Sequence, residues 1–158
     1  MLTIEELRAK VCEAIDQRAE QIIGIATHIL RNPESGFREE GTARFVQQQM
    51  DALGLPHRDS LALTGVRGRL DGAIPGPSVA VIGELDSMVV PAHPYADSVS
   101  GAAHACGHHC QIAMMLGVAS GPIHSGAAEA LTGRVDFFAV PAEELIEVEY
   151  RKDLRSQG

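Results

Sequence analysis

Cysteine and histidine are concentrated in the segment HACGHHC at positions 104–110. Cys106 and His108 lie two residues apart at the expected start of a helix, where both side chains can face the same point. Thiolate and imidazole are ligands that zinc and similar metals favour, and the positive end of a helix lowers the pKa of a thiol placed there. A buried cysteine beside surface histidines explains a lone C-x-H pattern equally well, but the density of ligands favours a metal site.

Two adjacent carboxylates follow an expected strand in the segment PAEE at positions 141–144. Because successive side chains of extended backbone point to opposite sides, Glu143 and Glu144 can take different roles. One can bind a metal while the other faces the substrate and acts as general base. A lone E-E pair is more often two solvated acids at the start of a loop, so this segment gains weight only together with the others.

A third acidic group, Glu84 and Asp86, follows another expected strand in the segment GELDSM at positions 83–88. Asp86 can hydrogen-bond a metal ligand and fix its orientation. It can equally be a turn or helix-capping residue. The three groups lie after strands or at the start of a helix, which is where ligands bind in open α/β sheets.

The first element expected to support this site is a long helix over about 4–31, since apolar residues recur there at helical spacing. Thr3 and Glu6 form a T-x-x-E capping box at its start. Pro33 ends it, because the residue before a proline avoids helical backbone. Cys12, inside this helix, is expected to be a small buried hydrophobe.

Three more helices are expected. One covers about 39–53, and a second covers about 107–119 and ends at Gly121-Pro122. A short third helix is expected over 125–131.

A strand is predicted over 66–70, where apolar and basic residues alternate. Two buried strands are predicted over the apolar runs 79–83 and 134–140, and 79–83 is expected to be covered on both faces. Residues 71–77 and 86–106 are predicted to be loops. Strands that alternate with helices indicate an α/β fold with a mostly parallel sheet flanked by helices.

The composition suits one domain of a globular protein: 158 residues, 45% of them hydrophobic and 22% charged. The formal net charge of −8 argues against nucleic acid or an anionic membrane surface as partner. No apolar run approaches the ~20 residues of a membrane span, and the N-terminus lacks the features of a signal peptide. The three cysteines do not suggest a disulfide framework. We therefore expect a cytoplasmic protein without a membrane partner.

The segments GELDSM, HACGHH, AMMLG and FFAVPAEE together resemble the metallo-amidohydrolases that include aminoacylases, auxin-conjugate hydrolases, aminobenzoyl-glutamate hydrolases and carboxypeptidase-G-like enzymes. The resemblance covers nearly the whole chain and implies a zinc-peptidase-like catalytic domain with two divalent ions, zinc or manganese. It implies that the substrate is a small-molecule amide such as an N-acyl amino acid, and that full-length relatives are homo-oligomers. It implies that Cys106, His108 and Glu144 are metal ligands. It also implies that Asp86 is a supporting acid and that Glu143 is the general base.

The chain departs from the family pattern at His109, where many relatives have aspartate, and at Gln111, where many have histidine. These departures bear on the substrate class. The resemblance also implies that residues 1–158 are the N-terminal part of a truncated catalytic domain, without the remaining ligands and without the lid or dimerisation domain. We therefore expect the isolated polypeptide to lack useful hydrolase activity and to expose an apolar face or edge of its sheet.

Two other interpretations stay open. In the first, the chain is a non-catalytic remnant that folds and binds metal without turnover. In the second, Cys106 is a thiol nucleophile with His108 or His104 as its base, which leaves the PAEE segment unexplained.

Overall fold

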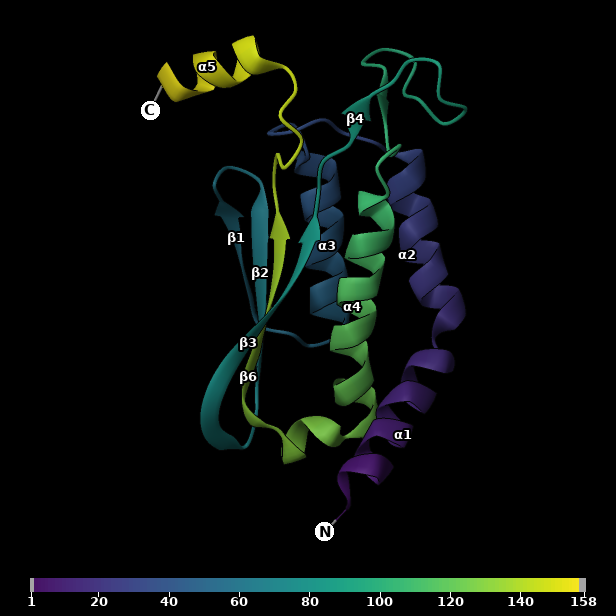
Figure 1. Cartoon of the computed structure of the whole chain (residues 1–158), viewed down its shortest axis with the longest axis vertical. Helices are drawn as coiled ribbons and strands as arrows, with labels where there is room; N and C mark the ends of the chain where they lie inside the picture. Colours follow the sequence, from purple (N-terminus) through teal and green to yellow (C-terminus); the bar gives the residue numbers. More distant parts are fainter. Residues whose placement is uncertain (1, 157–158) are drawn as a thin grey trace.

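The computed structural model describes residues 2–156, which form a four-stranded sheet with helices packed on one of its faces (Figure 1). The helices are α1 (Ile4–Asp16), α2 (Ala19–Arg31), α3 (Glu40–Ala52), α4 (His108–Ser125) and α5 (Val148–Ser156), with a short 3-10 helix at Ala127–Ala130. The strands are β1 (His57–Leu61), β2 (Gly65–Asp71), β3 (Ile74–Glu84), β4 (Met88–Val89), β5 (Ala102–Ala103) and β6 (Thr132–Val140). The main hydrophobic core lies between the sheet and α2, α3 and α4, and Phe137 of β6 is one of its largest buried side chains.

The strand order in the sheet is β1-β2-β6-β3. Only β3 and β6 run parallel, because α4 forms the crossover between them. β1 pairs antiparallel with β2 through a short connection, and β2 pairs antiparallel with β6. The α/β class is confirmed, but the expectation of a mostly parallel sheet is wrong. Two of the three pairings are antiparallel, because β1, whose sequence HRDSL has no apolar alternation, forms a hairpin with β2, and β2 runs opposite to β6.

The predicted long helix over 4–31 is two helices, α1 and α2, which are separated at Gln17 and Arg18. A straight helix of that length would span roughly 40 Å, whereas the 18 residues of α4 span only about 27 Å. The break lets both α1 and α2 pack against α4. The capping box at Thr3 and Glu6 is confirmed, but Cys12 is exposed rather than buried, because α1 buries only Ala14 completely.

The helix predicted to stop at Gly121-Pro122 continues to Ser125. A side chain at Gly121 would place its Cβ 2.9 Å from Val11 and 3.0 Å from Ile15, so the glycine allows close packing of α1 on α4. Pro122 removes one backbone hydrogen bond from α4, and this close packing offsets the loss.

β3 starts at Ile74, so part of the predicted 71–77 loop is strand. It lies at the edge of the sheet, with Val79 57% and Ile82 59% exposed, which corrects the expectation that 79–83 is covered on both faces. The expected exposed apolar edge is therefore present. The segment 86–106 is mostly irregular, as predicted, but contains the β4–β5 pair.

Asp136 joins β2 and β6 through its buried carboxylate, which accepts hydrogen bonds from Arg67 at 2.7 and 3.0 Å and from Arg69 at 3.2 Å. Burial alone would raise its pKa, but these bonds and the two positive charges hold the pKa of Asp136 below its ordinary value. A group with a lowered folded-state pKa adds stability above its unfolded pKa and loses it as the pH falls through the folded value.

We therefore expect Asp136→Asn to lower the free energy of unfolding by about 1–3 kcal/mol at pH 7. The difference from the wild type should shrink below pH ~4. Urea unfolding at pH 7 and below pH ~4 measures this difference in the free energy of unfolding. Asp71→Asn is the matched control, because Asp71 is an exposed aspartate of the same sheet. Equal stability of the wild type and Asp136→Asn at pH 7 would contradict the prediction.

Candidate metal centre

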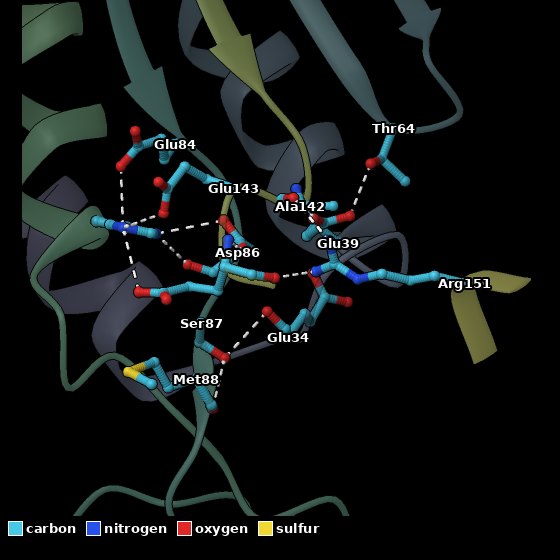
Figure 2. Close-up of polar contacts among 12 residues, drawn as sticks. Glu34, Glu39, Thr64, Glu84, Asp86, Ser87, Met88, Ala142, Glu143 and Arg151 are labelled. Carbon is cyan, nitrogen blue, oxygen red and sulfur yellow. Dashed lines mark hydrogen bonds and ion pairs between the residues drawn. The ribbon is translucent and has the colours of Figure 1, made fainter. Parts of the chain in front are cut away.

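The acids singled out in the sequence, among them Glu84, Asp86 and Glu143, meet at the carboxyl ends of β3 and β6 (Figure 2). Glu84 is the last residue of β3 and His108 is the first residue of α4. Glu143 and Glu144 come shortly after β6 ends at Val140. Because β3 and β6 are parallel neighbours, the residues that follow them lie at the same edge of the sheet.

Two groups of potential ligand atoms form at this edge, and both contain His108. In the first group, the ligand atoms of Cys106, His108 and Glu144 all lie within 4.8 Å of one another. The same limit holds for Glu84, His108 and Glu143. The sequence indicates the first group; it places Glu84 among the potential ligands at the strand ends but assigns it no role. The i, i+2 spacing of Glu84 and Asp86 was the available signal.

His108 is buried and oriented by the backbone of Asp86, whose carbonyl oxygen lies 2.8 Å from Nδ1. A carbonyl oxygen only accepts, so Nδ1 carries the hydrogen and Nε2 is the nitrogen available to a metal. Nε2 lies 2.9 Å from Glu84 Oε2 and 3.8 Å from one oxygen each of Glu143 and Glu144.

Asp86 is fully buried between His108 and the loop after β6. Its Oδ2 accepts a hydrogen bond of 3.0 Å from the backbone N–H of Glu144. Its Oδ1 lies 3.3 Å from His108 Nδ1 and has no hydrogen-bond partner among the described residues. Asp86 thus connects the α4 side of the centre to the β6 side.

The surroundings of Cys106 differ from the expectation of a thiolate favoured by the helix end. A hydrogen bond to Glu144, then slight desolvation and the negative charges of Glu144, Glu143 and Glu84, raise the pKa of the exposed Cys106 thiol. In this arrangement the acidic neighbours outweigh the helix N-terminus. A protonated thiol among carboxylates is a poor nucleophile, which disfavours the hypothesis of a cysteine enzyme.

His104 and His109 lie beside the centre but belong to neither ligand group. Their ring centroids are 5.4 Å apart. Burial, followed by the charges of His109 and His108, lowers the pKa of His104 to about 3, so it is neutral. Burial is also the main reason why the pKa of His109 is lowered.

The donor set fits a divalent cation. It combines a thiol, an imidazole and three carboxylates, which include ligands for both zinc and manganese. Among the salt bridges of residues 2–156, Glu84, Asp86, Glu143 and Glu144 have no lysine or arginine partner and pair only with His108. A bound cation would supply the missing positive charge.

Within the described residues, no helix combines the length and hydrophobicity that crossing a membrane requires.

Comparison with known proteins gives relatives of one kind, although no family model matches the sequence. The chain is 31% identical to an N-acyl-L-amino acid amidohydrolase of Geobacillus stearothermophilus over 147 residues, which are 91% of this chain and 38% of that protein. It is 32% identical over 126 residues to an IAA-amino acid hydrolase of Arabidopsis thaliana, covering 78% of this chain and 28% of that protein.

Among solved structures, the chain is similar to the Bacillus subtilis YxeP protein, described as a dinuclear metal binding peptidase from the M20 family. The TM-score is 0.70 with 28% identity, over 80% of this chain and 36% of that one. The chain thus spans between 28% and 38% of the lengths of these three proteins.

Proposed function

The chain belongs to the M20 family of peptidases and amidohydrolases, and we propose that it supplies metal ligands and the general base of an amide hydrolase. It spans roughly a third of the length of the family members that it matches. The observation that supports this most strongly is the first ligand group, Cys106, His108 and Glu144, with the Glu143 carboxylate beside it. We propose that the chain corresponds to the N-terminal part of the catalytic domain.

Cys106, His108 and Glu144 would hold one ion, and their thiolate and imidazole favour zinc. Glu84 and Glu143 offer only oxygen ligands, which manganese accepts readily. The two groups share a single nitrogen, His108 Nε2, and one nitrogen lone pair binds one ion. The described residues therefore provide one complete set of three ligands, and a second ion would need a ligand from outside this set.

A bound divalent ion would polarise the amide carbonyl and lower the pKa of the attacking water. Glu143 would do the proton transfer. Its side chain is half exposed, so it can reach a substrate, while Glu144 is 18% exposed and is held by its backbone bond to Asp86. Glu143 would accept a proton from water at a carboxylate oxygen and deliver it to the leaving nitrogen, giving an acid and an amine.

The names of the relatives support a proposal for the substrate class. Two of the relatives are named as an N-acyl-L-amino acid amidohydrolase and an IAA-amino acid hydrolase. We therefore propose a small amide of an amino acid as substrate.

A second candidate, binding of one ion without turnover, is favoured by the sharing of His108 Nε2 between the two ligand groups. Equilibrium dialysis with zinc or manganese tests the metal binding that both candidates require, and assays with N-acetyl amino acids on this chain and on a full-length relative with the same PAEE sequence, each with its Glu143→Gln variant, separate them. For the 158-residue polypeptide we expect one tightly bound ion and no hydrolysis above that of Glu143→Gln. Hydrolysis that depends on Glu143 would show a complete site, and a chain that binds no metal would refute both candidates.

The raised pKa of Cys106 predicts how metal binding depends on pH. Since the thiol is protonated at neutral pH, zinc must displace its proton, and the apparent affinity should rise about tenfold per pH unit for this proton. Zinc titrations between pH 6 and 8 measure the slope. Cys106→Ser should lower it by one proton and the exposed Cys12→Ser should leave it unchanged; identical slopes in all three proteins would contradict the prediction.

A further inference from the structure

The loop that carries Glu143 and Glu144 is held from two sides, by Glu39, which is distant in the sequence, and by Arg151 of α5, which follows the loop (Figure 2). We propose that Arg151 of α5 is a positioning residue of the metal centre, which acts together with Glu39 by fixing the backbone around Ala142. This inference rests on the proposed function, because the groups being positioned are the proposed base and metal ligand.

Ala142 is the point at which the loop needs support. Its φ of +55° lies in the left-handed region, which residues other than glycine rarely adopt and which persists only when the surroundings impose it. Both of its peptide groups are held by side chains. Its N–H donates to Glu39 Oε1 at 2.9 Å, and its carbonyl accepts from Arg151 Nη1 at 3.1 Å.

The guanidinium of Arg151 also donates through Nη2 to the carbonyl of Glu144. It therefore spans the backbone carbonyls on either side of Glu143 with two donors of one planar group. A fork of this kind fixes two acceptors relative to each other, which a single ammonium cannot do. With the bond from the Glu144 N–H to Asp86, the loop is fixed on both sides of the proposed base.

Glu39 is itself rigidly placed. Its side chain is fully buried, and its second oxygen accepts a hydrogen bond of 2.7 Å from Thr64. Gly36 leaves room for the guanidinium, because a Cβ there would lie 2.7 Å from Arg151 Nη2 and 2.9 Å from the Cβ of Ala142.

The contacts of α5 support a role at the site rather than in the core. None of its residues is buried. It is held by Arg38, which stacks 3.6 Å above the ring of Tyr150, and by a hydrogen bond from Tyr150 to the carbonyl of Phe37. Since α5 adds nothing to the buried core, changing Arg151 should affect the loop without unfolding the protein.

The test compares Arg151→Met with Lys152→Met in the 158-residue chain. Lys152 is the neighbouring exposed cation of α5, and its one ion pair is with Glu149 of the same helix. Hydrogen exchange of the Ala142 and Glu144 amides, followed by NMR, reports the loop without metal, and cobalt titration followed by visible absorption reports the centre.

In Arg151→Met we expect the two amides to exchange at least roughly tenfold faster than in the wild type. We expect the cobalt affinity to fall by about 10–100-fold and the cooperative unfolding to stay unchanged. Arg151→Lys should retain only part of the amide protection and of the cobalt affinity. Gly36→Ala should resemble Arg151→Met. Lys152→Met should match the wild type.

Wild-type protection of both amides in Arg151→Met would overturn the proposal, and so would equal loss in Lys152→Met. A wild-type chain that binds no cobalt would refute the proposed function, while the exchange rates would still decide whether Arg151 fixes the loop.

Discussion

His108→Asn should lower the affinity for zinc or cobalt by at least about 100-fold, which is the largest effect we expect on metal binding. His108 is the only residue common to both ligand groups, so its loss leaves neither group with three donors. Zinc binding to small structural sites is worth roughly 10–16 kcal/mol over about four ligands, so one ligand is worth roughly 3 kcal/mol, or about 100-fold.

Asparagine is preferable to alanine here because its side-chain amide can still donate to the carbonyl of Asp86, which preserves the fold around this buried position. His109→Asn is the matched control, since His109 is adjacent but outside both groups. Isothermal titration with either metal gives the affinities. Equal affinities of His108→Asn and the wild type would contradict the assignment, as would a comparable loss in His109→Asn.

Glu143→Gln should lower kcat of an intact enzyme by about 10²–10⁴-fold while leaving metal affinity nearly unchanged. The glutamine keeps the size of the side chain but cannot accept the proton from water. Glu144→Gln should show the opposite pattern and lower chiefly the metal affinity, because Glu144 belongs to the ligand group of Cys106.

Amide hydrolysis and metal content should be measured together, on a full-length family member that carries the same PAEE sequence. A glutamine variant at the Glu143 position with near-normal kcat would remove the role of general base. Loss of the metal in that variant would instead indicate that Glu143 is a ligand, as the second ligand group allows.

The parts of this centre that the sequence predicted are those that depend on local pattern. The apolar run 134–140 identifies β6. The helix start at His108 places Cys106 at the N-terminal end of α4. Because residues after neighbouring parallel strands share one edge, the convergence of the acids after 79–83 with those after 134–140 follows. The parallel pairing of β3 and β6 is the one pairing for which this argument holds.

The parts that could not be predicted depend on distant contacts. Glu39 and Ala142 are 103 residues apart, and nothing in either local sequence indicates their hydrogen bond. β1 is exposed and polar, so its pairing with β2 leaves no hydrophobic pattern. The raised pKa of Cys106 likewise arises from carboxylates 22 to 38 residues away, which outweigh the helix start visible in the sequence.

The central claim is that Cys106, His108 and Glu144 bind one ion together, and X-ray absorption at the zinc edge of the zinc-loaded chain tests it most directly. We expect one sulfur ligand at about 2.3 Å with nitrogen and oxygen ligands at about 2.0–2.2 Å, and loss of the sulfur in Cys106→Ser but not in Cys110→Ser. A wild-type shell of nitrogen and oxygen alone, or a sulfur ligand that persists in Cys106→Ser, would contradict the claim.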